Sequence, residues 1–509
     1  MSVKRVLVIA GSDSSGGAGL EADQRVLAAH GCYALTATTG LTAQNTLGVQ
    51  DIFVIPAEFV KKQINAGLED VGADVVKLGM LSSAETIDII AETLTTHQVP
   101  YVVLDPVMVS TSGSQLLPEQ AVQGLRTKLL PLTTILTPNI PEAQLLLKDC
   151  GVDAPEPEDV AGLIQLAKQV CSLGSKGVLL KGGHLPLTKE LKTARSTEEA
   201  TTVIDVLYDG EDVTLFETDF LVSKNTHGTG CSLASAIAAN LAHGKDMRLA
   251  VQSAVRFVEA GIKTSFDLGK GSGPINHFHS IHTIPFAPGR FLEYVLARPD
   301  VRSVWKRFTE HDFVQGMGNG KLPVERFKEY LVQDYLYLVH FARSNALAAY
   351  KAKDMDSIAA SSSIVLHIQR ETALHLDYCA SFGLSKEQME KYPETIACTA
   401  YSRYILDVGQ SEDWLALQMA LAPCLIGYGA IAQRLHGDKK TLREGNRYWK
   451  WIENYVADDY TEAVRLGSEL LETHMRQVSP SRIEELVKIF IRATELEISF
   501  WDMGMGEQV

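Results

Sequence analysis

The stretch NTHGTGCSLASAIAANLA, residues 225–242, decides how the first half of this sequence is interpreted. In it a Gly-Thr-Gly turn runs directly into a helix of small apolar residues, and a cysteine, Cys231, stands at the junction. At the start of a helix the backbone N–H groups point outward and the helix dipole favours negative charge. The stretch therefore predicts an anion-binding turn that carries a thiol.

The overall composition is that of a large globular protein. The chain has 509 residues, too many for one hydrophobic core, so we expect two or more domains. A net charge of −15 argues against nucleic acid or an anionic membrane as a partner of the whole molecule. Seven scattered cysteines without a C-x-x-C pair argue against a disulfide framework or a zinc ribbon. Since we find no segment with the roughly 18 apolar residues that span a bilayer, we expect a soluble, cytoplasmic protein.

Residues 1–278 alternate short apolar runs with helical stretches. Continuous runs of Val, Ile and Leu predict buried parallel strands, and the stretches between them predict helices on both faces of the sheet. The predicted strands lie at residues 5–10, 75–80, 101–109, 134–139 and 177–184, and the predicted helices at 18–31, 83–97 and 157–174. The pattern indicates an α/β domain with a mostly parallel sheet.

Helical periodicity dominates residues 291–509. The stretch before it, about residues 271–289, is rich in Gly, Pro and His, and a linker is predicted at 279–290. Beyond it, apolar residues recur at i, i+3, i+4 and i+7, which predicts an all-α bundle. The clearest helical segments are 323–352, 362–383, 412–437 and 480–504.

Polar residues follow the predicted strands of the first half. Asp105 follows one strand, Asn139 and Glu142 follow the next, and Lys181 follows a third. Open α/β sheets bind ligands at the carboxyl ends of their strands, so we expect these side chains to meet. Taken singly, a helix cap, a turn or a surface lysine would explain each of them. GAGLEA (17–22) also fits a degenerate dinucleotide fingerprint, but that match alone is too weak to favour an oxidoreductase.

Taken together, these motifs resemble a known kinase family. GSDSSGGAG, LTAQNT, LDPVM, TPNIPEA, LKGGH and NTHGTGCSLASAIAA resemble the hydroxymethylpyrimidine and hydroxymethylpyrimidine-phosphate kinases of the ribokinase-like superfamily, over about residues 4–280. The resemblance implies a ribokinase-like α/β fold. It also implies transfer of phosphate from ATP, with Mg²⁺, to 4-amino-5-hydroxymethyl-2-methylpyrimidine and then to its monophosphate.

The resemblance implies a role for individual residues. Cys231 would be the base that takes the hydroxymethyl proton, and its position at a helix N-terminus would lower the thiol pKa. The amide of Gln44 offers a donor and an acceptor together, which suits a ring nitrogen beside an amine. Backbone N–H groups of the turn would hold the developing negative charge. The other implied residues are Gly228, Thr229 and Gly230 in this anion hole, Gly11, Met80 and Val107 around the pyrimidine, Asp105 and Glu142 orienting Mg²⁺ and its waters, and Lys181 and Asn139 on the nucleotide side.

Reactive residues also stand on the apolar stripes of the second half. Asp334 shares a stripe with tyrosines and leucines, where a carboxylate needs a partner. Cys424 and Tyr428 share a helical face at i and i+4, and Glu497 lies on a largely apolar helix. For Cys424 taken alone, an inert core cysteine is the ordinary interpretation.

The second half resembles the thiaminase II (TenA) family, whose all-α fold is similar to that of haem oxygenase. FVQGMGNGKLPVERFKEYLVQDYLYL, LAPCLIGYG, WIENYVADDY and ELEISFWDM carry the resemblance, over about residues 291–506. It implies that Cys424 attacks the pyrimidine ring of thiamin or a related aminopyrimidine, with Glu497 as proton donor and acceptor. Asp334 would hold the ring nitrogen. Tyr337, Tyr428 and Tyr455 would contact the ring, with Phe500 as a wall. Neither haem nor flavin is expected.

Several alternatives stay open. His367, Glu371 and His375 share one helical face, as metal ligands in bundles do, but no matching Glu-x-x-His segment appears, which favours a hydrogen-bonded polar stripe. The polar stretch 188–202 predicts a surface loop of unassigned role. The kinase half could be a pyridoxal-type kinase, and the bundle could bind pyrimidines or thiamin without turnover. The whole chain could also act as a scaffold.

The two resemblances together predict a bifunctional enzyme of thiamin biosynthesis and salvage, an arrangement that resembles fungal salvage proteins. The bundle would release hydroxymethylpyrimidine, and the kinase would convert it to the diphosphate. The product of one half would thus be the substrate of the other. Both resembled families form homo-oligomers, so we expect an assembly that acts on small molecules.

Overall fold

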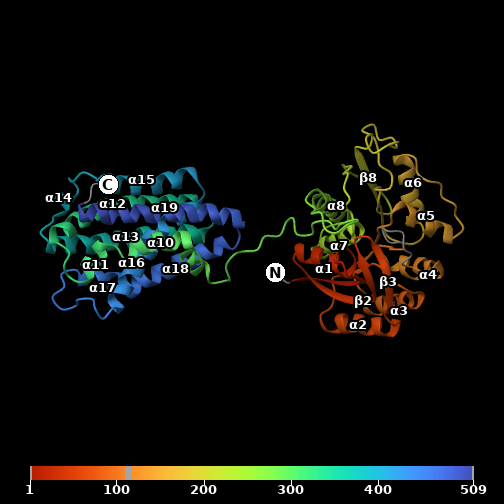
Figure 1. Ribbon diagram of the computed structural model, residues 1–509, viewed down its shortest axis with the longest axis horizontal. Helices are drawn as coiled ribbons and strands as arrows, with labels where there is room; N and C mark the ends of the chain where they lie inside the picture. Colours follow the sequence, from red (N-terminus) through yellow and green to blue (C-terminus); the bar gives the residue numbers. More distant parts are fainter. Residues whose placement is uncertain (1–2, 109–116, 118, 507–509) are drawn as a thin grey trace. The chain divides into compact units, whose positions relative to one another are not determined.

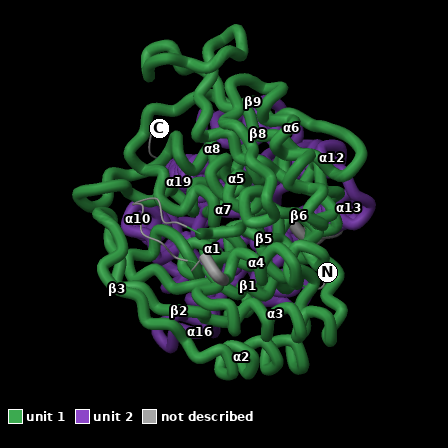
Figure 2. Tube along the Cα trace, turned by 90° about the vertical axis from the view of Figure 1, so that its right-hand side faces the viewer, with its two compact units in different colours: residues 1–281 green, residues 282–509 purple. Residues whose placement is uncertain are grey.

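The computed structural model describes residues 3–108, 117 and 119–506. The chain forms two compact units, residues 1–281 and residues 282–509 (Figures 1 and 2). The division falls inside the segment 279–290 that the sequence predicts as a linker. Each unit has hydrophobic core clusters of its own.

A twisted sheet forms the centre of unit 1. Within the described residues it has nine strands in the order β3-β2-β1-β4-β5-β6-β7-β8-β9. The six strands from β2 to β7 in this order run parallel, while β3, β8 and β9 add antiparallel edges. The strands are β1 (Lys4–Asp13), β2 (Cys32–Asn45), β3 (Gly48–Val54), β4 (Val75–Leu78), β5 (Val102–Leu104), β6 (Ile135–Leu136), β7 (Val178–Leu180), β8 (Thr202–Tyr208) and β9 (Val213–Asp219).

Helices cover both faces of this sheet, because its central strands are apolar on both sides. In β1, Val6 and Val8 face one core cluster and Leu7 and Ile9 face the other. The first cluster packs against α1 (Gly19–Ala29), α7 (Thr229–Ala242) and α8 (Met247–Lys263). The opposite face packs against α2 (Ala57–Asp70), α3 (Ala84–His97), α4 (Glu119–Gly124), η1 (Leu125–Leu129), η2 (Leu130–Leu132), α5 (Ile140–Asp149) and α6 (Val160–Cys171). The predicted α/β fold is confirmed.

Every strand and helix predicted for unit 1 is present, but β2, β3 and β9 were not predicted. In β2, buried Leu35 and Ala37 alternate with exposed Tyr33 and with Thr36. Because several positions of β2 are threonines, its alternation of buried and exposed residues does not show as an alternation of apolar and polar residues. The polar stretch 188–202 lies between β7 and β8 and is mostly exposed, as predicted.

Unit 2 is helical throughout its described residues and encloses one large core cluster. Four long helices, α12, α13, α16 and α19, correspond to the four predicted segments, and the predicted bundle is confirmed. The helices are α9 (Phe291–Ala297), α10 (Pro299–Thr309), α11 (Asp312–Gly318), α12 (Val324–Lys351), α13 (Met355–Ser381), α14 (Lys386–Met389), α15 (Ile396–Ser411), α16 (Trp414–Gly437), α17 (Trp449–Val456), α18 (Asp458–Met475) and α19 (Pro480–Met505).

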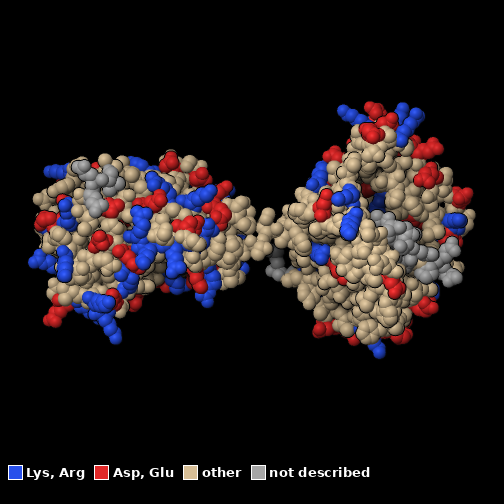
Figure 3. Space-filling model, viewed as in Figure 1, with Lys and Arg blue, Asp and Glu red and all other residues tan. Residues whose placement is uncertain are grey.

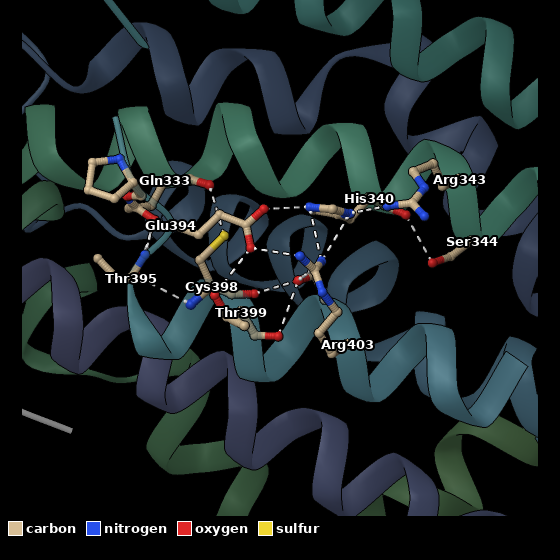
Figure 4. Close-up of polar contacts among 11 residues, drawn as sticks. Gln333, His340, Arg343, Ser344, Glu394, Thr395, Cys398, Thr399 and Arg403 are labelled. Atoms are coloured by element: carbon tan, nitrogen blue, oxygen red, sulfur yellow. Dashed lines mark hydrogen bonds and ion pairs between the residues drawn. The ribbon is translucent and has the colours of Figure 1, made fainter. Parts of the chain in front are cut away.

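A polar brace fixes α15 against α12 (Figure 4). The Glu394 carboxylate lies 2.7 Å from His340 Nε2 on α12 and accepts from Arg403 on α15 at 3.1 Å. Gln333 of α12 donates to the Pro393 carbonyl at 3.0 Å and accepts from the Thr395 N–H at 2.9 Å. Because these bonds tie the start of α15 to the middle of α12, they set the spacing between the inward faces of the two helices.

The prediction that no segment is apolar enough to span a bilayer was wrong for α16. This helix is long and apolar enough to cross a membrane by length and composition alone, with a mean hydropathy of 1.7 over 18 residues. Gln418 and Pro423 interrupt its apolar residues, which hides its length in the sequence. In the bundle 78% of that window is buried, so its apolar character serves the protein core. Such a helix is weak evidence for a membrane span.

Charged side chains of both signs are interspersed over the surface of unit 2 in Figure 3. On α18, for example, Arg465 pairs with Glu462 and Glu469 at 2.6 and 2.5 Å. Exposed pairs of this kind contribute roughly 0–1 kcal/mol each. The fold therefore rests on the buried clusters rather than on these pairs.

Candidate active sites

A cavity of about 890 Å³ opens at the carboxyl ends of the parallel strands in unit 1. The ends of all six parallel strands and the start of α7 contribute to it, at the edge where open α/β sheets bind ligands. Every residue that the sequence predicted for the kinase half lines this one cavity: Gly11, Gln44, Met80, Asp105, Val107, Asn139, Glu142, Lys181, Gly228, Thr229, Gly230 and Cys231.

Asp13, at the end of β1, organises the glycine-rich loop. Its carboxylate accepts from the backbone N–H groups of Ser15, Gly17 and Ala18 at 2.9, 3.1 and 2.9 Å. It also lies 2.9 Å from His227 Nε2 in the turn before α7. These hydrogen bonds outweigh burial and lower the pKa of Asp13 to about 2. An ionised carboxylate thus holds two loops together that are more than 200 residues apart in sequence.

The two loops touch where Gly228 meets Gly17. Gly228 caps α7 with a left-handed φ of 78°, and a Cβ there would collide with the Gly17 carbonyl. Any other residue would be strained by the positive φ and would also push the loops apart. The backbone N–H groups of the turn are therefore held at the N-terminus of α7. One of them, that of Thr229, makes a long 3.3 Å turn bond to Thr226.

Cys231 is the third residue of α7, as predicted, but its pKa shifts in the opposite direction. Burial raises the thiol pKa to about 11, and the negative charges of Asp23 and Asp105 reinforce the shift. The positive charge of Lys77 opposes it. The prediction of a lowered pKa counted the helix dipole and left out desolvation, which is larger here. The thiol is therefore protonated in the free protein.

A buried ion pair lies under Cys231. Lys77 on β4 donates to Asp23 on α1 at 2.9 and 3.0 Å, and both side chains are fully buried. Ser235, one helical turn after Cys231, donates to the same carboxylate at 2.7 Å. The pair therefore places a charged lysine, which lines the cavity, on the side of the helix that carries the thiol.

Lys181 lines the same cavity and lies between two carboxylates. Its ammonium lies 2.9 Å from Asp105 and 3.8 Å from Glu142. A Cβ on Gly230 would lie 3.2 Å from the same ammonium, so the lysine reaches the anion hole. Burial, with the nearby charge of Asp105, raises the pKa of Glu142 to about 7. Two closely spaced carboxylates fit a Mg²⁺ ion that keeps its waters, because a cation would relieve their repulsion.

Asn139 has a structural use at this edge. Its side chain accepts from the Glu142 N–H at 2.8 Å, and the Glu142 carboxylate accepts from the Asn139 N–H at 2.8 Å. This reciprocal capping box starts α5. Glu142 is therefore held in place by its own helix while it faces Lys181.

The pyrimidine end of the cavity is built from Gly11, Gln44 and Met80. A Cβ on Gly11 would collide with the Met80 side chain, so glycine leaves room for methionine as an apolar wall. Gln44 lies between Thr42 and His227, at 3.1 and 3.2 Å. A flat ring edged by nitrogen and an amine would find apolar contacts and one amide here.

The second candidate site is the centre of the helical unit, where Glu497 is buried. Tyr401 donates to its carboxylate at 2.8 Å, Tyr428 lies at 3.5 Å, and Cys424 forms a further side-chain hydrogen bond. Burial dominates and raises the Glu497 pKa to about 8, with the negative charge of Asp334 adding to the shift. A thiol is thus in contact with a carboxyl group whose pKa is about 8.

The other residues predicted for the bundle surround this pair. Burial raises the Asp334 pKa to about 7, although a hydrogen bond with Tyr330 lowers it. The Tyr337 ring stacks on Tyr401 with centroids 4.8 Å apart. The remaining aromatic contacts join Tyr337 with Phe500 at 5.8 Å and Tyr428 with Tyr455 at 5.4 Å.

Polar atoms at this centre lack hydrogen-bond partners of good geometry. Tyr337 Oη and Trp451 Nε1 are two such buried atoms within the described part of the chain. Buried polar atoms are normally paired, and an unpaired one costs about 1–3 kcal/mol. Their presence around a thiol and a carboxyl supports a ligand-binding site for a polar aromatic molecule.

Metal binding in the bundle gains no support. No group of three or more His, Cys, Asp and Glu suited to a metal occurs among the described residues. His367 lies on α13, half-buried. The side chains of Glu371 and His375 lie outside the described residues, so that stripe stays a prediction.

Sequence reasoning missed several residues at both sites. Tyr401, the closest partner of Glu497, lies on α15, a helix that the sequence analysis did not single out. Its spacing from the buried Ala397 and Ile405, four residues to either side, was the available signal. Asp13 and His227 lie inside quoted motifs, but only the fold brings them together. Lys77 stands in a buried strand, where a charge always demands a partner.

The close approach of the two loops makes Gly228 testable. Gly228→Ala forces a collision with Gly17 and displaces the anion-binding turn, so we expect ATP to bind unit 1 at least about tenfold more weakly, since displacements of about 1 Å carry such penalties. Isothermal titration calorimetry measures the affinity. Gly244→Ala is the matched control: its φ of 83° is equally left-handed, but nothing lies within 4 Å. Wild-type affinity in Gly228→Ala would contradict this account of the turn.

Comparisons with known proteins agree with both halves. Residues 13–276 match the family described as phosphomethylpyrimidine kinase, and residues 298–507 match the TENA/THI-4/PQQC family. Among solved structures, a pyridoxal kinase of Bacillus subtilis in an ADP complex is 34% identical, covers 55% of this chain and 98% of its own, and gives a TM-score of 0.47. A phosphomethylpyrimidine kinase of Clostridium difficile is 36% identical over 50% of this chain and 97% of its own, with a TM-score of 0.42.

Two yeast relatives match along nearly the whole chain. The putative hydroxymethylpyrimidine/phosphomethylpyrimidine kinase 2 of Schizosaccharomyces pombe is 42% identical, over 99% of this chain and 91% of its own. The hydroxymethylpyrimidine/phosphomethylpyrimidine kinase THI20 of Saccharomyces cerevisiae is 34% identical, over 98% of this chain and 95% of its own. The chain therefore belongs to the hydroxymethylpyrimidine/phosphomethylpyrimidine kinase family, in the bifunctional thiamine-biosynthesis form that joins an ATP-dependent kinase domain to a C-terminal TENA/THI-4/PQQC domain.

Proposed function

We propose that unit 1 phosphorylates 4-amino-5-hydroxymethyl-2-methylpyrimidine and its monophosphate, and that unit 2 supplies the pyrimidine by hydrolysing thiamin or related aminopyrimidines. The observation that carries the proposal is that each unit places one cysteine among groups that move protons or hold charge. Cys231 faces an anion hole and two lysines, and Cys424 faces Glu497.

In unit 1, phosphoryl transfer is chiefly a matter of positioning and charge. Gln44, Gly11, Met80 and Val107 would hold the ring so that its hydroxymethyl arm points toward Cys231. The turn at 228–230 and Lys181 would hold the phosphate charge that develops. Mg²⁺, held through Asp105 and Glu142, would neutralise charge on ATP.

Cys231 would take the hydroxymethyl proton as the oxygen bonds to phosphorus. Its high pKa makes it a strong base once ionised, but ionisation needs a nearby positive charge. Lys77 is that charge, and Asp23 keeps it in place. The buried pair thus offsets part of the desolvation penalty on the thiolate.

In unit 2, the ionised Glu497 would take the proton of the Cys424 thiol, and the thiolate would add to the pyrimidine ring. The neutral carboxyl of Glu497 would return the proton as the intermediate breaks down. Asp334 would exchange a proton with the ring nitrogen, for which a pKa of about 7 is suitable. Departure of the leaving group and addition of water would give hydroxymethylpyrimidine.

The protein's setting and assembly also belong to this proposal. None of the seven cysteines, all of which the structure describes, forms a disulfide bond, which fits a reducing compartment such as the cytoplasm. Tyr350, Met355 and Leu366 of α12 and α13 are 85%, 74% and 60% exposed, and they would be covered in a homo-oligomer.

The two cysteines should separate the two activities. We expect Cys231→Ala to lower pyrimidine phosphorylation by at least about 100-fold while leaving thiamin hydrolysis intact, and Cys424→Ala to do the reverse. Coupled ADP release measures the first activity and chromatography of released pyrimidine the second.

Matched controls for these variants are Cys171→Ala in unit 1, a buried thiol outside the cavity lining, and Cys398→Ala in unit 2, a buried thiol that donates to the Gln333 carbonyl. Both should keep both activities. If Cys424→Ala still hydrolyses thiamin, the nucleophile assignment is wrong, and if the wild type binds thiamin without hydrolysing it, unit 2 is a binding module.

Glu497 gives the hydrolysis a defined pH dependence. Since Glu497 must be ionised to accept the thiol proton and its pKa is about 8, kcat/KM should rise as pH increases through about 8 and then level off. Tyr401→Phe removes a donor that lowers this pKa, so the midpoint should move to higher pH. Stopped assays from pH 6 to pH 9.5 measure both profiles. A flat profile, or a midpoint that moves to lower pH, would sink this role for Glu497.

A further inference from the structure

The amide of Gln44 lies between two hydrogen-bonding neighbours in unit 1. One end is 3.1 Å from Thr42 Oγ1 and the other end is 3.2 Å from His227 Nε2. Thr42 and His227 are buried, whereas Gln44 is half-buried and lines the cavity. The neighbours therefore face the two ends of the amide, and its open edge faces a ligand.

His227 acts as a donor in this arrangement. Its Nε2 lies 2.9 Å from the Asp13 carboxylate, whose pKa is about 2. An ionised carboxylate only accepts hydrogen bonds, so the Nε2 atom must carry the hydrogen. Any second neighbour of that N–H is then also required to accept.

Thr42 acts as an acceptor toward Gln44. Its hydroxyl has one hydrogen, and Thr42 Oγ1 donates it to the Ser12 carbonyl at 2.9 Å. The hydroxyl oxygen still has lone pairs, so it receives a hydrogen from the amide. The two neighbours thus make opposite demands on the two ends of the Gln44 amide.

Only one orientation of the amide meets both demands. The structure places Gln44 Nε2 next to His227 Nε2, so that two N–H donors face each other. It places Gln44 Oε1 next to the Thr42 hydroxyl, whose hydrogen is already donated to Ser12. A half-turn of the amide exchanges nitrogen and oxygen in place and removes both conflicts. In that orientation the oxygen accepts from His227 and the NH₂ group donates to Thr42.

We propose that the Asp13–His227 pair is a positioning device that fixes this orientation of Gln44 and thereby selects a 4-aminopyrimidine over its 4-oxo analogue. The inference rests on the proposed kinase function of unit 1. One N–H and one oxygen lone pair of Gln44 stay free at the open edge. They match a ring nitrogen that accepts, on the Thr42 side, and an amine that donates, on the His227 side.

In the 4-oxo analogue both hydrogen-bonding roles are reversed: the ring N–H donates where the ring nitrogen accepted, and the carbonyl accepts where the amine donated. A fixed amide mismatches it twice, whereas an amide free to turn would accept either compound. The amino compound fills all four hydrogen-bonding positions of the Gln44 amide. Discrimination then comes from the polar groups that the wrong ring leaves unpaired.

The His227 ring is itself clamped, so the device is rigid. A Cβ on Gly17 would collide with the ring, and Pro274 packs at the same place. A phenyl ring fits this slot, but it has no N–H. His227→Phe therefore keeps the packing and removes the hydrogen bond that orients Gln44.

The test measures kcat/KM of the full-length protein for 4-amino- and for 4-oxo-5-hydroxymethyl-2-methylpyrimidine with Mg-ATP. We expect the wild type to prefer the amino compound by at least about 100-fold. His227→Phe should reduce that preference about tenfold. Loss of the Asp13 contact also loosens the turn at 228–230, which lowers kcat for both compounds alike and so cancels in the ratio of their kcat/KM values. Ser15→Ala removes a different hydroxyl partner of Asp13 and should keep the wild-type preference.

An unchanged preference in an active His227→Phe would overturn the proposal. If that variant fails to fold, a crystal structure of the wild type with the amino compound decides. The amine is expected on the His227 side of Gln44, and a ring nitrogen there would contradict the inference. A wild type that does not phosphorylate the amino compound would instead refute the proposed kinase function, and this inference with it.

Discussion

The Asp13 carboxylate holds together everything that unit 1 needs for chemistry. It gathers the N–H groups of the glycine-rich loop and reaches across to His227 in the turn before α7. Because it is ionised and nearly buried, breaking these bonds would leave an uncompensated charge. The contact between Gly17 and Gly228 then follows, and with it the position of the anion hole. The same carboxylate decides which nitrogen of His227 carries hydrogen, so one ion pair links the phosphate end of the site to its pyrimidine end.

Burial raises the pKa of one group at each cysteine site, but the group differs between the two sites. In unit 1 the thiol pKa rises, and Lys77, paired with an Asp23 carboxylate that also accepts from Ser235, supplies the opposing charge. In unit 2 the raised pKa belongs to Glu497, so the acid beside Cys424 exchanges protons near neutral pH. A base that deprotonates a phosphate acceptor needs positive charge around it, whereas a thiol that attacks the pyrimidine ring of thiamin needs an acceptor for its own proton.

Much of the fold was visible in the sequence, because both periodicities are strong. The apolar run of β1 and the i, i+4 spacing of Cys424 and Tyr428 needed no structure. Strand β2 was not predicted, because threonines interrupt its apolar residues. The predicted direction of the Cys231 pKa shift was wrong. Desolvation depends on how deeply the turn is buried in the fold, which the local sequence does not encode. Tyr401 and the Asp13–His227 pair are long-range contacts, so only the fold could bring them to their partners.

The central claim is that the two units act in sequence on one pyrimidine, and the most direct measurement gives the full-length protein thiamin and Mg-ATP together. Mass spectrometry then follows the pyrimidine products. The account predicts hydroxymethylpyrimidine monophosphate and diphosphate, with little of the free alcohol left. Accumulation of unphosphorylated hydroxymethylpyrimidine would contradict the kinase assignment. Intact thiamin, with added hydroxymethylpyrimidine still phosphorylated, would contradict hydrolysis by unit 2.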